Sequence, residues 1–247
     1  MRRGSKNRAR CAGEEGGRGA STPDVGVGML FNPGTARANY GLYLVTDSAL
    51  AMGRPLLDVV RAAVDGGVTC VQVREKGFTS RAYVERLLSV RPLLRERGIP
   101  LFVNDRVDVA LAVKADGIHL GQTDLPLAMA RDLSAGRLLI GVSCESVQDA
   151  VDAERGGADY ASVSPVFATP TKTDTAPPPG LDGVRAVRRA VCLPVVAIGG
   201  IGATNAADVI RAGADGICVV SAIVSAPDPR AAAASLRGIV ERAGHGA

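Results

Sequence analysis

One unit of sequence recurs from residue 40 onward, and this repeat limits the fold more than any other feature of the chain. Each unit contains a short apolar run, a loop, an amphipathic segment and a glycine-containing turn. Eight such runs are predicted to be strands: 42–45, 69–73, 101–103, 117–120, 138–142, 160–163, 195–198 and 216–220. The runs are continuously apolar rather than alternating, which is typical of a parallel sheet covered on both faces.

Helices are predicted after the strands, at 55–65, 80–97, 107–113, 126–133, 146–155, 182–190, 205–212 and 229–243. Pro55 and Pro126 stand where first-turn prolines belong, and Thr79 or Ser80 and Thr204 are candidate N-caps. Eight strand–helix units predict a single α/β domain with a (β/α)8 TIM barrel fold. A doubly wound open sheet is the alternative, but the residues after the first strand lack its G-x-G-x-x-G signature.

The first 38 residues differ from the rest, because they are rich in Arg and Gly and show no helical period. They are predicted to be a disordered basic extension, or an over-long start with Met29 as the true initiator, and 39–247 to be the barrel domain. Residues 1–40 contain seven Lys or Arg and three acids, which accounts for the whole net charge of +4. The barrel is therefore neutral overall, and a broad nucleic-acid surface is not expected there.

The remaining composition excludes several classes of protein. No apolar stretch reaches the length of about 18 residues that a membrane span needs. The five cysteines form no C-x-x-C pair and so give no zinc-site spacing. This pattern is typical of a protein kept in the reducing cytoplasm.

Polar residues follow the predicted strands at the points where catalytic groups of such barrels lie. In chain order they are Gln72, Arg74, Glu75 and Lys76, then Asn104 and Asp105, then His119, Gln122 and Asp124, then Ser143, then the segment 164–172, then 199–202, and finally Val220 and Ser221. Because the carboxyl ends of the strands meet at one rim, these groups are expected to surround one cavity. His119 lies within a strand run and is predicted to be a packed core histidine, with Cys144 as a small filler.

Three cations in this set, Arg74, Lys76 and Lys172, point to a polyanionic ligand. Asp105 and Asp124 follow adjacent strands, and carboxylate oxygens beside phosphate-binding cations suit Mg²⁺. Simple salt bridges at the rim are the alternative for any one pair.

A second anion site is predicted at Gly199 and Gly200 together with Val220 and Ser221 one strand later, since loops after the last two strands of such barrels often bind phosphate. A plain tight turn is the alternative there. A diphosphate with Mg²⁺ on one side and a monophosphate on the other favour transfer chemistry with pyrophosphate as leaving group.

The chain resembles the thiamine-phosphate synthase family over essentially 40–240. The resemblance rests on short motifs in a fixed order: VQVREK at 71–76, VNDR at 103–106, GIHLGQTD at 117–124, GVS at 141–143, PVFATPTK at 165–172, AIGGI at 197–201 and VVSAI at 219–223. The resemblance implies a transferase that joins 4-amino-2-methyl-5-hydroxymethylpyrimidine diphosphate to 4-methyl-5-(2-phosphoethyl)thiazole, or its carboxylated form. The products are thiamine phosphate and pyrophosphate.

The resemblance also implies roles for individual residues. Those expected to hold the pyrimidine diphosphate are Gln72, Val73, Arg74, Glu75, Lys76, Asn104, Ser143 and Lys172, of which Arg74, Lys76, Ser143 and Lys172 are assigned to catalysis. Those expected to hold the thiazole phosphate are Thr169, Pro170, Thr171, Gly199, Gly200, Val220 and Ser221. Asp105 and Asp124 are expected to bind Mg²⁺.

Pyrophosphate is expected to leave dissociatively, from a cation stabilised by the aminopyrimidine. The expected partners are the small-molecule substrates, and binding to nucleic acid or to a membrane is not expected. The sequence leaves open whether the protein forms a homo-oligomer.

Two alternatives remain from the sequence. A thiazole tautomerase on the same barrel handles only the thiazole and does not need the set Arg74, Lys76, Asp105, Asp124 and Lys172. A non-catalytic phosphate-binding regulator, or an RNA-binding protein that uses the basic extension, is the alternative from another class.

Overall fold

A closed parallel barrel of eight strands forms the centre of the structure, a computed structural model that describes residues 38–169 and 178–244. The strands follow one another around the barrel in sequence order, and β8 closes it against β1. They are β1 (Leu42–Val45), β2 (Cys70–Val73), β3 (Leu101–Asn104), β4 (Gly117–Leu120), β5 (Leu139–Cys144), β6 (Tyr160–Val163), β7 (Val195–Ile198) and β8 (Gly216–Val219). The predicted (β/α)8 fold is therefore confirmed.

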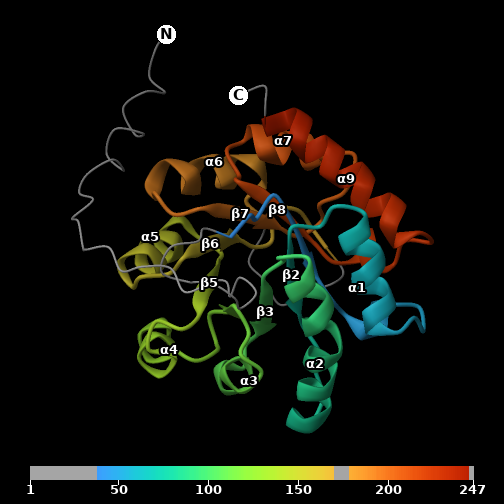
Figure 1. Cartoon of the computed structure of the whole chain (residues 1–247). Coiled ribbons are helices and arrows are strands. Elements are labelled where there is room, and N and C mark those ends of the chain that lie inside the picture. The colour runs from blue at the N-terminus through green and yellow to red at the C-terminus, as the bar shows by residue number, and fades with distance from the viewer. Residues whose placement is uncertain (1–37, 170–177, 245–247) are drawn as a thin grey trace, which may run out of the picture. The chain divides into compact units, whose positions relative to one another are not determined.

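Helices surround this barrel, and most of them connect one strand to the next (Figure 1). They are α1 (Leu56–Asp65), α2 (Ser80–Glu96), α3 (Val107–Ala112), α4 (Leu127–Ser134), α5 (Val147–Arg155), α6 (Gly180–Ala190), α7 (Ala206–Arg211), α8 (Ser221–Val224) and α9 (Pro229–Gly244). A 3-10 helix, η1 (Ser48–Leu50), follows β1. Within the described residues, α8 and η1 are the two helical elements that the repeat did not predict.

Local sequence explains where several helices begin. Thr79 caps α2 by accepting a hydrogen bond from the backbone N–H of Ala82, as predicted. Ser146 and Asp149 form a reciprocal capping box at the start of α5. The prediction for Thr204 is wrong, because Asn205 occupies the N-cap of α7 and turns its side chain back to the preceding loop instead.

Two apolar layers hold the barrel together. The larger one lies between the strands and the surrounding helices, and the smaller one fills the barrel interior around Tyr40, Tyr43, Phe102 and Tyr160. These rings fit because glycines on neighbouring strands leave room for them. A Cβ atom at Gly141 would come within 1.9 Å of the Tyr160 ring, and one at Gly117 within 2.2 Å of Phe102.

At the amino end of the barrel, three aspartates join neighbouring strands. Asp116, Asp159 and Asp215 directly precede β4, β6 and β8, and the Oδ2 atom of each accepts a backbone N–H at or near the start of the strand before it. For Asp159 the donor is Ile140, at 2.7 Å. An Ala-Asp pair stands before each of the three strands, so a repeat in the sequence produces the same strand-to-strand contact three times. We call each of these aspartate contacts a buttress.

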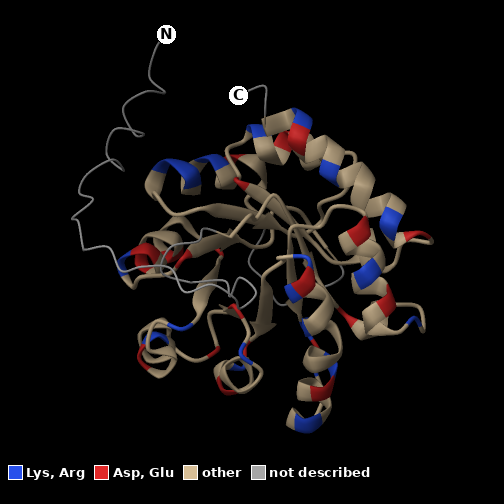
Figure 2. Ribbon diagram, viewed as in Figure 1, with Lys and Arg blue, Asp and Glu red and all other residues tan. Residues whose placement is uncertain are grey.

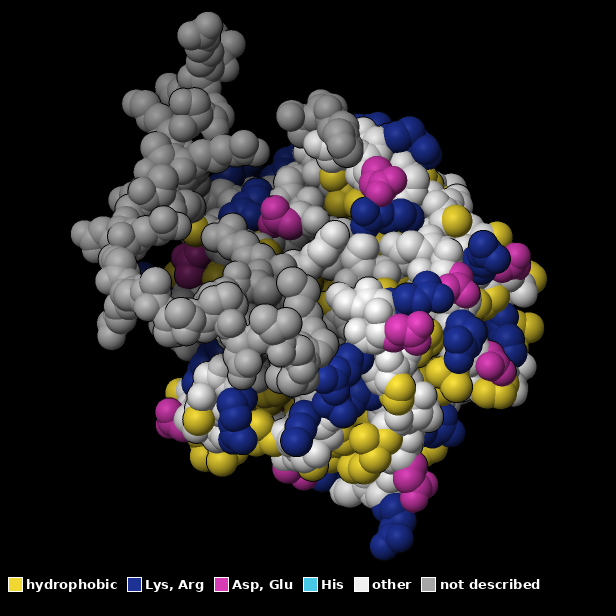
Figure 3. All heavy atoms as spheres, viewed as in Figure 1, with side chains coloured by type: hydrophobic (Ala, Val, Ile, Leu, Met, Phe, Trp, Pro, Cys, Tyr) yellow, Lys and Arg dark blue, Asp and Glu magenta, His cyan; other side chains and the backbone are white. Residues whose placement is uncertain are grey.

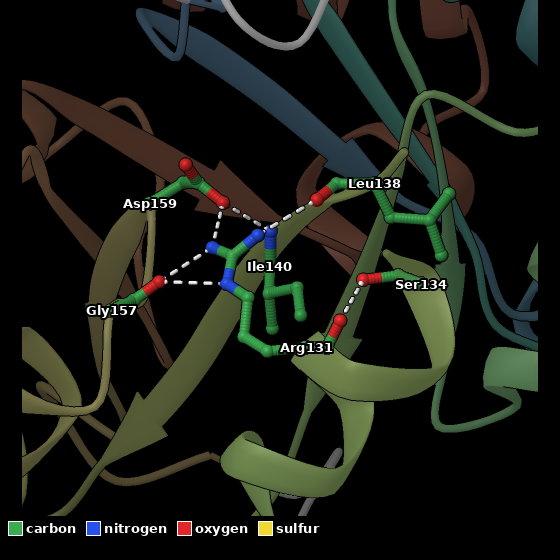
Figure 4. A network of polar contacts seen from close by, with 6 residues as sticks. All are labelled: Arg131, Ser134, Leu138, Ile140, Gly157 and Asp159. Carbon is green, nitrogen blue, oxygen red and sulfur yellow. Dashed lines mark hydrogen bonds and ion pairs between the residues drawn. The ribbon is translucent and has the colours of Figure 1, made fainter. Parts of the chain in front are cut away.

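The Asp159 buttress is reinforced by Arg131, which extends from α4 (Figure 4). The guanidinium pairs with the Asp159 carboxylate and also donates to the carbonyl oxygens of Leu138, at 3.0 Å, and Gly157, at 2.6 and 2.8 Å. All three guanidinium nitrogens of Arg131 thus donate to an acceptor, and hydrogen bonds to charged groups stabilise a fold by about 1.5–3 kcal/mol each. This end of the barrel is built for stability.

Charges lie mainly on the helices, whereas the strands carry few of them (Figure 2). On the face seen in Figure 3, Lys and Arg are interspersed with Asp and Glu rather than gathered into a patch of one sign. No helix in the described part of the chain is both long and apolar enough to span a bilayer. The predicted extension 1–38 lies outside the described residues except for Ala38, which packs into the barrel interior.

Candidate active site

A cavity of about 580 Å³ opens at the carboxyl ends of the strands. Residues from the ends of all eight strands, or from the loops that follow them, line it. Twelve of the residues predicted for the site are among them: Gln72, Arg74, Lys76, Asn104, Asp105, Asp124, Ser143, Thr169, Gly199, Gly200, Val220 and Ser221. The rule that strand ends meet at one rim therefore places these groups around one space.

The positive side of the cavity is formed by the loop after β2. Arg74 is held there by Asp47, whose Oδ2 lies 2.9 Å from the guanidinium, and its backbone N–H donates to the hydroxyl of Thr46. Because a single carboxylate engages one guanidinium nitrogen, further N–H groups of the fork remain for a ligand. Lys76 is exposed on the same loop and adds a mobile positive charge.

Two carboxylates face each other beside these cations. Asp124 is fixed by the backbone N–H of Gly121, 2.6 Å from its Oδ2. Asp105 has a left-handed backbone with φ of +63°, and its N–H donates to the carbonyl of His119. Burial, followed by the hydrogen bond and charge of Asp124, raises the pKa of Asp105 from 3.8 to about 6. Two like charges held this close favour a ligand that neutralises them, either a proton or a cation.

The opposite side of the cavity is lined by a glycine loop after β7. Gly199 and Gly200 have φ of +105° and +63°, which side chains rarely adopt. Asn205 ties the loop by accepting the N–H of Gly202 and donating to the carbonyl of Gly200. The neighbouring strand β8 is followed by α8, which begins at Ser221, so this part of the rim combines glycine backbone with the start of a short helix.

The floor of the cavity contains polar side chains that the sequence analysis did not assign to the site. Tyr43, Tyr160, Ser162 and Cys218 face the cavity from inside the barrel. His119 is satisfied, as expected, but it lines the cavity rather than the core, with Ser143 at 2.9 Å from its Nε2. The only signal in the sequence was the presence of polar residues within apolar strand runs.

Other predicted residues do not line the cavity. Val73 is fully buried in β2, and Glu75 is 8% exposed and has one buried carboxylate oxygen without a hydrogen-bond partner. Pro170, Thr171 and Lys172 lie outside the described residues. Cys144 is buried, and burial raises the pKa of its thiol to about 12, which agrees with a packing role.

Comparisons with known proteins show which proteins the chain is similar to. A family model described as thiamine monophosphate synthase matches residues 42–223. The thiamine-phosphate synthase of Chloroflexus aurantiacus is 56% identical over 202 residues, which cover 82% of this chain and 93% of that protein. The thiamine-phosphate synthase of Albidiferax ferrireducens is 54% identical over 200 residues, with 81% and 91% covered.

Solved structures extend the comparison to the fold. The thiamine phosphate pyrophosphorylase from Pyrococcus furiosus superposes with a TM-score of 0.78 at 43% identity, over 83% of this chain and 98% of that one. A 3-hexulose-6-phosphate synthase reaches a TM-score of 0.63 at only 17% identity, over 81% of this chain and 99% of that one, and so shares the fold alone.

Proposed function

The chain belongs to the thiamine monophosphate synthase family of transferases, and from this premise we propose that it joins the pyrimidine diphosphate to the thiazole phosphate, plain or carboxylated, and releases pyrophosphate. One observation carries the proposal. Cations and paired carboxylates occupy one side of a single cavity, while a glycine loop and the start of α8 occupy the other. The two sides match two phosphorylated substrates of unequal charge.

The first step of the proposed reaction is departure of pyrophosphate from the exocyclic methylene of the pyrimidine. The aminopyrimidine can stabilise the resulting cation, so the step needs neutralisation of the leaving group more than a general base. Arg74 and Lys76 supply that charge, and the Asp47 pair holds the Arg74 fork ready before the substrate arrives. Fixed charges of this kind are the largest catalytic contribution in many enzymes.

Mg²⁺ fits the carboxylate pair. Within 38–169 and 178–244, no three His, Cys, Asp or Glu side chains gather into a metal cluster, but Mg²⁺ needs only one or two carboxylates together with substrate oxygens. Asp105 and Asp124 would hold it, and the raised pKa of Asp105 reflects a site that binds positive charge favourably. When bound, the ion would neutralise negative charge on the diphosphate.

The second substrate would bind through its phosphate at the glycine loop and Ser221. The thiazole nitrogen has no proton to lose, so it can attack the pyrimidine methylene without a base. Thr169 lines the cavity, and Pro170 and Thr171 are assigned to this substrate only by their sequence motif, as Lys172 is assigned to the diphosphate. The cytoplasmic location and the preference for small-molecule partners stay predictions as well.

The direct test is to incubate the purified protein with both substrates and Mg²⁺ and to measure thiamine phosphate and pyrophosphate. Equal release of the two products, abolished by a chelator and restored by Mg²⁺, is the expected result. Isomerisation of the thiazole alone would favour the tautomerase alternative. Binding of both substrates without any product would favour a regulator.

The same assay tests the role of one cation, Lys172, in turnover. Lys172→Ala is expected to lower turnover on the order of 10²–10³-fold, as for loss of one preorganised charge stabiliser. Arg211→Ala is the matched control, because Arg211 pairs with Asp208 on the outer face of α7. Equal turnover of the two variants would remove Lys172 from the mechanism.

A further inference from the structure

Five polar side chains form one continuous hydrogen-bonded chain across the floor of the cavity. Gln72 Nε2 donates to Tyr43 Oη at 3.0 Å, the hydroxyls of Tyr43 and Tyr160 are 3.1 Å apart, and Tyr160 Oη is 2.8 Å from His119 Nδ1. The Nε2 atom of His119 is 2.9 Å from Ser143 Oγ, which completes the chain. The five residues come from β2, β1, β6, β4 and β5, so only the closed barrel brings them together.

The direction of this chain follows from proton counting. A phenol has one proton, and Tyr43 receives a hydrogen bond from the Gln72 amide, so its own proton points to Tyr160. Tyr160 then donates to His119 Nδ1. A neutral imidazole that accepts at Nδ1 carries its proton on Nε2, and this proton is donated to Ser143 Oγ.

Ser143 is the end of the chain and faces the cavity. Since its oxygen receives a hydrogen bond from His119, its own proton is left to donate to a ligand. Its backbone carbonyl accepts from the Gln122 side chain, which further restrains the residue. The chain therefore presents a hydroxyl of fixed polarity to whatever lies above it.

Burial explains why these hydrogen bonds keep one direction. Tyr43 and Tyr160 are 1% and 0% exposed, so each phenol must direct its proton to a partner rather than to water. Burial also raises the pKa of both phenols well above 10, which keeps them protonated and able to donate. The Tyr160 ring is stacked on His119 and fixes the plane of the imidazole.

We propose that Tyr43, Tyr160 and His119 are positioning residues that hold His119 as its Nε2–H tautomer and make Ser143 a hydrogen-bond donor to the substrate. The enzymatic part of this inference rests on the proposed function, and the tautomer does not. Substrates are thereby selected for an acceptor atom, a ring nitrogen or an anionic oxygen, opposite Ser143. A donor at that position would meet a proton already in place.

The tautomer is tested on the ligand-free protein by ¹⁵N NMR of histidine-labelled material. The chain contains two histidines, so His245→Gln leaves His119 as the single imidazole. The expected spectrum shows an unprotonated Nδ1 and a protonated Nε2. A proton on Nδ1, or a mixture of tautomers, would overturn the proposal whether or not the protein is an enzyme.

Kinetic measurements then test whether the hydrogen-bonded chain of side chains acts through Ser143. Tyr160→Phe keeps the ring and is expected to lower kcat/KM about 10-fold, the value of one lost hydrogen bond of roughly 1.4 kcal/mol. In a Ser143→Ala background the same change is expected to have no further effect, because the serine hydroxyl is already gone. Full additivity of the two losses would contradict the proposal.

The matched control is Tyr40→Phe. The Tyr40 ring packs 4.6 Å from that of Tyr160 in the same aromatic cluster, outside the hydroxyl chain. It is expected to change kcat/KM by less than about 2-fold, because the buried ring is kept and no hydrogen bond of the five-residue network is removed. An equal loss in Tyr40→Phe and Tyr160→Phe would show that packing, and not the hydroxyl chain, is responsible.

Discussion

The two ends of the barrel use the same residue types for opposite purposes. At the amino end, Asp159 accepts from the backbone N–H of Ile140 and pairs with Arg131, so its charge is matched. At the carboxyl end, Asp105 and Asp124 lie against each other, and the pKa of Asp105 is raised to about 6. Carboxylates that accept hydrogen bonds from donors stabilise the fold. Carboxylates that lie against each other repel, and binding of a proton or a cation relieves this repulsion.

The difference lies in geometry and not in composition. The amino-end aspartates precede their strands by one residue and reach sideways to a neighbouring strand. Asp105 follows β3 in a left-handed conformation that turns it toward the cavity. Active sites commonly contain strained backbone of this kind, and the stability of the rest of the scaffold compensates for its free-energy cost.

The largest expected effect is on activity. Asp124→Asn is expected to lower kcat/KM by at least about 100-fold, the upper value for loss of a group that merely supports a metal ligand. Thermal stability should be unchanged or higher, because one of two repelling charges is removed. Parallel measurement of turnover and of the thermal midpoint checks this, and a large drop in the midpoint would place Asp124 with the structural aspartates.

The converse change removes a buttress. Asp159→Ala is expected to lower the free energy of unfolding by about 2–3 kcal/mol, since the Ile140 N–H and Arg131 lose their shared acceptor. Activity well below the transition should be unaffected. Urea unfolding measures the loss, and Asp182→Ala, which removes an exposed pair with Arg185, serves as the control with a change under about 1 kcal/mol.

Titration distinguishes the two ends without large structural changes. In the Mg²⁺-free protein, Asp105 holds its proton up to a pH of about 6, whereas in the unfolded chain it releases it near 3.8. The contribution of Asp105 to stability is therefore complete below 3.8 and is lost as the pH rises to about 6.

The measurement compares urea midpoints of the parent protein and Asp105→Asn across that pH range. The parent should lose stability relative to the variant between 3.8 and about 6, and the difference should be constant above. A parent that gains stability relative to Asp105→Asn over the same range would mean that Asp105 is paired with a cation, like the amino-end aspartates.

The smallest effect concerns a structural residue near the functional end. Ser146→Ala removes the capping box of α5 and is expected to cost about 1 kcal/mol of unfolding free energy. Ser146→Thr keeps an acceptor and should cost less. Turnover should be the same in both, and a kinetic effect would show that the carboxyl end cannot be divided into structural and functional residues.

Sequence reasoning located the rim but misjudged the interior. Strand ends are marked by polar residues after apolar runs, so Arg74, Asp105 and Asp124 could be placed around one cavity. β5 extends to Cys144, beyond the predicted 142, and therefore includes Ser143 in the strand. Tyr43 and Tyr160 were missed because apolar residues on both faces of a strand hide which ones point into the barrel.

The sequence by itself determined the eight-fold repeat, the parallel sheet and the order of the polar groups along the rim, because these depend on residues near one another in the chain. The tertiary structure decided which side chains share a proton, a charge or a contact across the barrel. His119 illustrates the division, since its partners Tyr160 and Ser143 come from different strands. Such contacts depend on closure and register, which no single strand encodes.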